Sequence, residues 1–173
     1  MTANRKRWLL AGVFGYLGLV ALVLLALGSF RAEAGQGVVQ PIPFSHPLHA
    51  GGLALDCSHC HQWTTQSRHA GLPEVAICMG CHAEVATESP HIMELARLYE
   101  QGGEVAWVRV YENAWHVYFS HKRHVLAGVD CAVCHGDVTV QERIRQVTSL
   151  KMGWCVNCHN DNQASVDCAT CHR

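Results

Sequence analysis

Apolar residues are concentrated in one uninterrupted run near the N-terminus of the chain. Residues 8–30 contain no charged side chain, and a helix of about 20 apolar residues is enough to cross the hydrocarbon part of a bilayer. Arg5, Lys6 and Arg7 precede the run, and basic residues beside such a helix favour the cytoplasmic side. The pattern therefore predicts a cytoplasmic tip and transmembrane anchor in residues 1–30, with the rest of the chain on the outer, periplasmic side.

A cleaved signal peptide is the main alternative for this run. Ala32-Glu33-Ala34 has the small-residue form of a cleavage site. However, the apolar run is longer than the roughly 7–15 apolar residues of a signal peptide. We therefore expect the helix to remain as a single-pass anchor in the cytoplasmic membrane.

Periodic patterns are sparse after the anchor. Residues 31–43 contain two glycines and two prolines, which predicts a linker, and residues 44–173 then form a separate domain. Only residues 90–101 show a sustained helical period, because Ser89 and Pro90 fit a helix start and a glycine pair follows residue 101. We expect the rest of this domain to be mostly irregular.

A longer pattern occurs twice in this domain. Phe-Ser-His-x-x-His stands at residues 44–49 and again at 119–124, and each copy precedes two Cys-x-x-Cys-His motifs. A further Cys-x-x-Cys-His motif stands alone near the C-terminus. The layout predicts a duplicated module, residues 44–82 and 119–159, followed by a terminal motif at 168–172.

Cysteine and histidine are unusually frequent, with ten Cys and 13 His among 173 residues. Every Cys belongs to a CxxC pair, and a His follows each pair at once. The cysteines are Cys57, Cys60, Cys78, Cys81, Cys131, Cys134, Cys155, Cys158, Cys168 and Cys171, and the histidines are His61, His82, His135, His159 and His172. CxxCH is the attachment motif for c-type haem, so the sequence predicts five covalently bound haems.

The spacing of the motif has a chemical reason. Two thiols three positions apart can both add to the vinyl groups along one edge of a haem, and the adjacent imidazole can then bind the iron. A zinc site made of two CxxC pairs does not require a His after each second Cys. Five disulfides would leave the five histidines unexplained.

Haems would also explain how so irregular a domain folds. About 130 residues with little regular structure bury only a thin core, and covalently fixed apolar groups can act as staples. The predicted fold is one N-terminal transmembrane helix plus a small, mostly irregular and α-helical multihaem cytochrome c domain with the haems as its core. The formal net charge of −1 lacks the basic excess typical of nucleic-acid binding.

Four histidines outside the motifs are the strongest candidates for the second axial ligand of iron. His46 and His49 are spaced i, i+3, as are His121 and His124, so the two imidazoles of each pair project from one helical turn. We expect the first His of each pair to bind at the next motif along the chain and the second to reach another haem.

One of the five irons has no partner in this scheme. Met152, three residues before the fourth motif, is the favoured ligand, because a thioether binds haem iron and raises its potential. Packing against a haem face is the other role open to Met152. His69, His91 and His116 are the alternative ligands, whereas His59 is expected to face solvent or a haem carboxylate.

Three stretches resemble the pentahaem cytochrome subunit of alternative complex III: FSHxxH–CxxCH, VYFSHKRHVLAGVDCAVCHG and LKMGWCVNCH. The resemblance extends over nearly the whole chain and implies a class III or c7-like multihaem fold. It supports the HxxH histidines and Met152 as distal ligands, whereas His91 and His116 have no counterpart in the family pattern.

The resemblance also implies a place in a membrane complex. This would be a quinol-oxidising respiratory or photosynthetic complex, in which electrons arrive from an iron–sulfur subunit and leave to a monohaem cytochrome or a soluble acceptor. The chain would then carry electrons and have no catalytic site of its own. The alternative is the multihaem subunit of a related quinone reductase or periplasmic reductase complex. A catalytic multihaem reductase is disfavoured, because it needs an iron with an open position and the candidate ligands fill all five.

Overall fold

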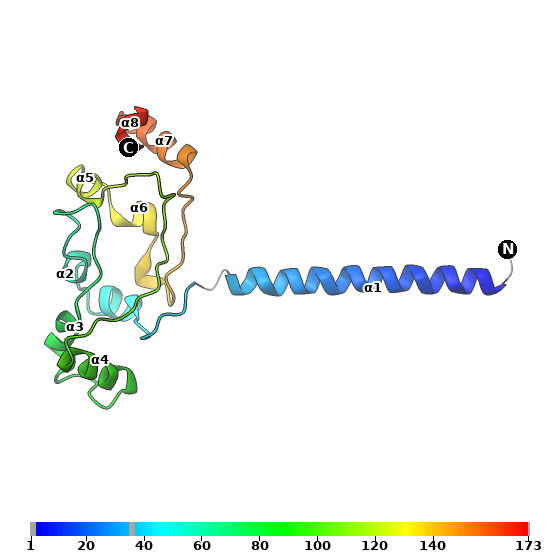
Figure 1. Ribbon diagram of the computed structural model, residues 1–173, viewed down its shortest axis with the longest axis horizontal. Coiled ribbons are helices and arrows are strands. Elements are labelled where there is room, and N and C mark those ends of the chain that lie inside the picture. The colour runs from blue at the N-terminus through cyan, green and yellow to red at the C-terminus, as the bar shows by residue number, and fades with distance from the viewer. Residues whose placement is uncertain (1–2, 35–36, 173) are drawn as a thin grey trace. The chain divides into compact units, whose positions relative to one another are not determined.

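The computed structural model describes residues 3–34 and 37–172, which divide into two units (Figure 1). The first unit reaches to residue 37 and contains one long helix. The second unit, from residue 38 onward, contains all the cysteines. The boundary falls inside the segment that the sequence predicts as a linker.

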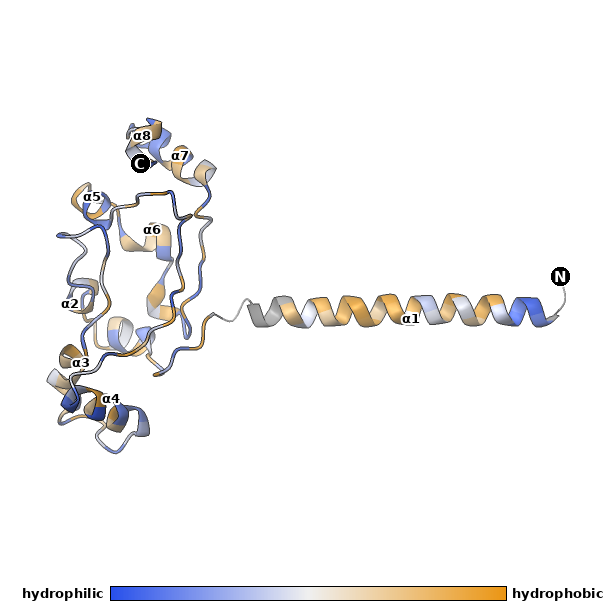
Figure 2. Cartoon of the chain, viewed as in Figure 1, coloured by the Kyte–Doolittle hydropathy of each residue, from blue (hydrophilic) through white to orange (hydrophobic). Residues whose placement is uncertain are grey.

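Helix α1 (Ala3–Ala34) contains the apolar run, which Figure 2 shows as a nearly continuous apolar band. Its apolar residues surround the helix instead of forming one stripe, and no side chain of Asn4–Phe30 is buried by the polypeptide. Such a helix is typical of a membrane span. Within the described residues it is the one helix long and apolar enough to cross a bilayer. Its backbone continues through residues 31–34, the first residues of the expected linker.

Short helices joined by irregular segments make up the second unit. They are η1 (Pro47–Gly52), α2 (Cys57–Cys60), α3 (Val75–His82), α4 (Pro90–Glu100), α5 (His121–Leu126), α6 (Cys131–His135), η2 (Val138–Val140), α7 (Met152–Asp161) and α8 (Cys168–Cys171). Across residues 37–172 the backbone forms no strand, and one antiparallel bridge joins Val117 to His172. A mostly irregular and helical fold is therefore confirmed for this part of the chain.

Helix α4 confirms the helix expected at residues 90–101. It begins after Ser89 with Pro90 in its first turn, and it ends at Glu100. Proline is favoured there because the first helical N–H groups have no partner within the helix. The helix stops where Gly102 takes a φ of 63°, a conformation that glycine adopts without strain.

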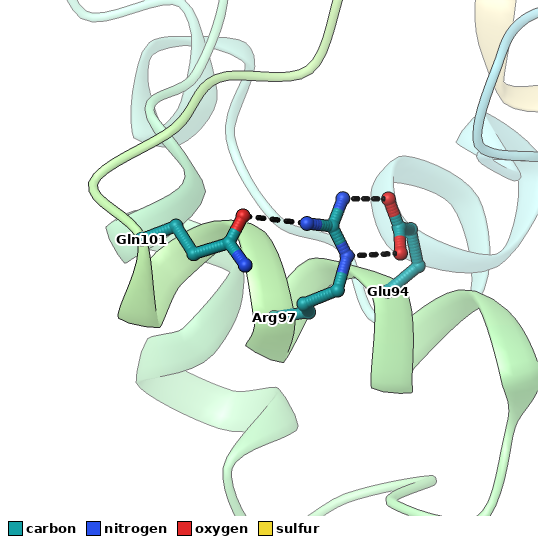
Figure 3. A network of polar contacts seen from close by, with 3 residues as sticks. All are labelled: Glu94, Arg97 and Gln101. Carbon is teal, nitrogen blue, oxygen red and sulfur yellow. Dashed lines mark hydrogen bonds and ion pairs between the residues drawn. The ribbon is translucent and has the colours of Figure 1, made fainter.

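The two faces of α4 differ in polarity. Leu95 is buried, whereas the exposed Arg97 donates two hydrogen bonds to the Glu94 carboxylate, at 2.6 and 2.8 Å, and one to Gln101 at 2.5 Å (Figure 3). These hydrogen bonds, and then the charge of Arg97, hold the pKa of Glu94 below its usual value. The apolar face of α4 packs against α3.

The apolar core of the second unit is small. Among the described residues, the buried hydrophobic side chains are Ile42, Val75 and Leu95. They are surrounded by the partly buried Cys78, Met79, Ile92, Leu98, Val105 and Trp107. Polypeptide packing by itself therefore stabilises mainly the region around α3 and α4, and the other short helices require further apolar material between them.

Candidate haem-binding sites

In every Cys-x-x-Cys-His motif both cysteines lie in a helix. We number the motifs in chain order as site I (residues 57–61, α2), site II (78–82, α3), site III (131–135, α6), site IV (155–159, α7) and site V (168–172, α8). At sites I and V the histidine directly follows that helix. All ten cysteines are free thiols. Positions i and i+3 of a helix lie on one side, so both thiols of each motif can reach one edge of the same flat ring.

Aspartate residues start the helices of sites I, III and V. Asp56, Asp130 and Asp167 stand directly before the first Cys, and each carboxylate accepts a hydrogen bond at 2.7 Å from the backbone N–H two residues further on. This is the N-cap arrangement, which satisfies one of the free N–H groups of the first helical turn. At sites II and IV the helix begins three residues earlier, at Val75 and Met152, so the motif lies inside a longer helix.

Backbone carbonyls orient the imidazoles of four motifs. The Nδ1 atom lies 2.7 Å from the Gly71 oxygen in His61, 3.0 Å from Val85 in His82, 2.6 Å from Ser165 in His159 and 3.3 Å from His116 in His172. A carbonyl oxygen only accepts, so Nδ1 carries the proton and Nε2 keeps its lone pair. This is the arrangement by which a protein holds a metal-binding imidazole in place.

An aromatic ring orients the fifth motif imidazole. The ring of Tyr111 lies edge-on against His135, with the ring centres 4.5 Å apart. The Tyr111 hydroxyl donates to the Arg145 carbonyl at 3.0 Å and accepts from the Val147 N–H at 3.1 Å. The irregular segment that follows site III therefore holds Tyr111 in place against His135.

The two HxxH segments have the same three-dimensional arrangement. In each, the Phe ring stacks on the second His and meets the first His edge-on: Phe44 lies 4.4 Å from His49 and 4.8 Å from His46, and Phe119 lies 4.5 Å from His124 and 4.9 Å from His121. The Nδ1 of the second His faces the preceding Ser carbonyl, at 2.9 Å for Ser45 and 2.8 Å for Ser120. The sequence duplication is thus also a structural one.

The HxxH imidazoles lie opposite imidazoles of the motifs. The ring centres are 6.1 Å apart for His49 and His82, 6.4 Å for His121 and His135, and 5.9 Å for His124 and His159. For His46, burial and then the charges of His61 and His49 lower the pKa to about 4, so His61 is among the groups near it. The first His of the second pair thus faces the next motif along the chain, and the second His of each pair faces the motif after it.

These spacings fit haem iron. Two imidazoles that bind one metal atom through bonds of about 2 Å hold their ring centres about 6 Å apart. In addition, the buried Nε1–H of Trp107 has no hydrogen-bond partner among the described residues. Trp107 and Cys78 of site II both pack against the core cluster, and a haem carboxylate there could accept from this N–H. No three His, Cys, Asp or Glu side chains in the described ranges gather around one point that could hold a bare metal ion.

Thiols of different sites lie close together around site I. Burial raises the pKa of the Cys78 thiol, and Cys60 of site I raises it further. Burial also raises the pKa of Cys131, and the neighbouring Cys57 adds to that shift. Sites II and III therefore both adjoin site I.

Sites IV and V continue the same row. Burial raises the pKa of Cys134, with a further contribution from Cys158 of site IV. Burial likewise raises the pKa of Cys155, to which Cys171 of site V contributes. The order of the sites in space is thus II, I, III, IV, V, and Figure 1 shows α3 and α8 toward opposite ends of the unit.

The remaining candidate ligands differ in their surroundings. His59, His69, His91 and His116 are all exposed, and the first three have no imidazole of a motif stacked on them in the described part of the chain. Met152, at the start of α7, has 69% of its surface exposed. His116 lies against His172, with the ring centres 5.4 Å apart.

Sequence reasoning missed the residues that position the ligands. An Asp directly before the first Cys in three of five motifs was a readable capping signal. The Phe before each HxxH was visible in the repeat, but its stacking on the second His was not. The carbonyls that hold Nδ1 carry no sequence signal, because every residue has one.

Comparisons with known proteins agree with this description. Residues 117–173 match the family described as cytochrome c7 and related cytochrome c, and this stretch contains sites III, IV and V. This part of the chain is therefore similar to multihaem c-type cytochromes, in which the haems are attached covalently.

A more specific similarity extends over most of the chain. Over 185 aligned residues the chain is 29% identical to the multiheme cytochrome c subunit of the menaquinone reductase of Nitratidesulfovibrio vulgaris. The alignment covers 91% of this chain and 88% of that protein.

Proposed function

We propose that this chain is the electron-transfer subunit of a membrane-bound quinone oxidoreductase complex and that it carries five covalently bound c-type haems. The row of five CxxCH sites, three of them facing an HxxH imidazole, is the observation that carries the proposal. A haem bound at such a site supplies reversible one-electron chemistry at its iron. Because the thiols of neighbouring sites lie close to one another, the row of sites is suited to electron transfer from one end of the unit to the other.

The residues of each site have distinct roles in this proposal. The two thiols each add across a vinyl double bond, which leaves no other product. The imidazole of each motif would hold the iron of its haem, and His46, His49, His121 and His124 would each supply a second imidazole to one of four haems. Hydrogen bonds from Nδ1 to backbone carbonyls fix the imidazole orientations and increase the electron donation of Nε2.

Similarity over most of the chain favours a quinone reductase as the complex. The relative from Nitratidesulfovibrio vulgaris is a subunit of a menaquinone reductase. In such a complex, electrons would enter the haem row from a soluble donor and leave towards iron–sulfur and membrane subunits that reduce the quinone.

Quinol oxidation in an alternative complex III is the second candidate. The stretches around both HxxH segments and around site IV resemble the pentahaem subunit of that complex. In that case electrons would run in the opposite direction, from an iron–sulfur subunit through the haem row to a monohaem cytochrome or a soluble acceptor.

Helix α1 supports a location for the subunit in this proposal. The apolar span Asn4–Phe30 would anchor the chain in the cytoplasmic membrane, and the basic residues before it favour an N-terminus in the cytoplasm. The haem unit then lies on the periplasmic side, where it meets donor or acceptor proteins.

Isolation of the intact complex tests the proposed function. The tagged chain is purified from its native membranes in mild detergent, its covalent haems are counted by the pyridine haemochrome assay, and its companions are identified by mass spectrometry. Five haems with iron–sulfur and integral membrane subunits are expected. Fewer than five covalent haems, or purification without any membrane or iron–sulfur subunit, would contradict the proposal.

A rate measurement then separates the two candidates. The purified complex is mixed either with a menaquinol analogue or with the oxidised analogue and a reduced soluble cytochrome, and the haem absorbance is followed. Haem oxidation that depends on the oxidised quinone supports the reductase, whereas haem reduction that depends on the quinol supports alternative complex III.

A further inference from the structure

Site V differs from the other four sites because no HxxH imidazole faces it. His49, His121 and His124 lie opposite the imidazoles of sites II, III and IV, and His61 of site I is among the groups that lower the pKa of His46. His172 of site V instead faces the segment of residues 114–118, which directly precedes the second HxxH segment.

This segment runs along α8 and is tied to it by backbone contacts. Val117 forms an antiparallel bridge with His172, and the N–H of Tyr118 donates to the Cys171 carbonyl at 2.8 Å. The Nδ1 of His172 lies 3.3 Å from the carbonyl oxygen of His116. The segment is therefore held against site V by contacts on both sides of residue 117.

The two imidazoles are arranged like the other pairs. Their ring centres lie 5.4 Å apart and their planes differ by 25°, against 5.9–6.4 Å and 9–58° at sites II, III and IV. A shift of less than roughly 1 Å brings the pair to the spacing of two imidazoles on one metal atom. The ring of Trp115 lies edge-on to that of His116, with the ring centres 5.3 Å apart.

Met152 lacks a comparable position. It lies three residues before Cys155 of site IV, where the second axial position already faces His124, whose ring centre is 5.9 Å from that of His159. Met152 and His116 are both exposed, but within residues 37–172 no hydrogen bond or ring contact ties Met152 to site V, whereas His116 is tied there by its backbone carbonyl and by its ring.

We propose that His116 is the second axial ligand of the haem at Cys168 and Cys171, opposite His172. This rests on the proposed haem content of the chain. One continuous segment, residues 116–124, then supplies the second ligand to sites III, IV and V through His121, His124 and His116. All five irons have two imidazole ligands, and none has the thioether ligand that the sequence favours.

Spectroscopy of the full-length holoprotein in detergent tests this inference. The variants are His116→Ala, His116→Met and Met152→Leu, with His91→Ala as a control for loss of an exposed histidine. Haem per chain is measured first. The near-infrared band of Met–iron ligation is then recorded in the oxidised protein, and carbon monoxide binding is recorded in the reduced protein.

The expected results are specific to one iron. The wild type shows no Met–iron band and binds no carbon monoxide. His116→Ala binds one carbon monoxide per five haems, and His116→Met acquires the band. Met152→Leu and His91→Ala match the wild type. If His116→Ala does not fold, His116→Met provides the test: the near-infrared Met–iron band in this variant supports the inference, and its absence contradicts it.

Three results would overturn the inference: a wild-type band that Met152→Leu removes, carbon monoxide binding by the wild type, or His116 variants with unchanged spectra. Each of these leaves five covalent haems in place, so the proposed function stands. A haem count below five, by contrast, would count against the proposed haem content itself.

Discussion

Asp130 provides a quantitative test of how the attachment motifs are held. Its carboxylate accepts a hydrogen bond from the Ala132 N–H at 2.7 Å, at the start of the five-residue helix α6. Replacing an N-cap Asp by Ala costs about 1 kcal/mol of folding free energy, within a range of roughly 0.5–2 kcal/mol. For a unit of about 135 residues, that loss lowers the melting temperature by about 3–5 °C.

Two further variants separate the hydrogen bond from the charge. Asp130→Asn keeps a capping acceptor and should melt close to the wild type, because Asn caps helices about as well as Asp. Asp161→Ala removes the same charge from the last residue of α7, where a carboxylate is unfavourable to the helix dipole. It should not lower the melting temperature.

The assay is thermal unfolding of the full-length holoprotein in detergent, followed by circular dichroism in the haem absorption band. The haem content of each variant is measured first, because a lost haem would lower stability for another reason. Equal melting temperatures for Asp130→Ala and Asp130→Asn would refute the capping argument, as would an equally large loss in Asp161→Ala.

Three other predictions concern the haem ligands, the haem attachment and the anchor. Phe119→Leu removes the ring that stacks on His124, and it should lower the free energy of unfolding by about 1 kcal/mol while the haem count stays at five; an unchanged denaturant midpoint would contradict the orienting role of Phe119. Replacing both Cys131 and Cys134 by Ala should lower the pyridine haemochrome count from five to four, whereas an unchanged count would show that site III holds no covalent haem. Protease added to intact spheroplasts should degrade the haem unit and spare a tag placed before residue 4, and full protection of the haem unit would reverse the proposed orientation.

Local sequence determined the chemistry of the attachment sites. A site for c-type haem needs two thiols at helical spacing, which form the two thioethers, and an adjacent imidazole for the iron. All of these groups lie within five consecutive residues. The apolar helix was readable for a similar reason, since a bilayer requires an unbroken run of apolar residues. Helix α4 could be predicted because its buried Leu95 belongs to a regular amphipathic period.

Only the tertiary structure decided which imidazoles face one another. His49 meets His82, and His116 meets His172, through irregular segments whose direction no periodic pattern predicts. The sequence offers four HxxH histidines for five irons, and it therefore favoured Met152 as the ligand of the fifth. Spacing along the chain does not show that residues 114–118 lie against α8. The order of the sites in space, II, I, III, IV, V, also departs from chain order. The reason is physical: an attachment motif is specified by five consecutive residues, whereas the pairing of imidazoles depends on how irregular segments of the chain close their loops.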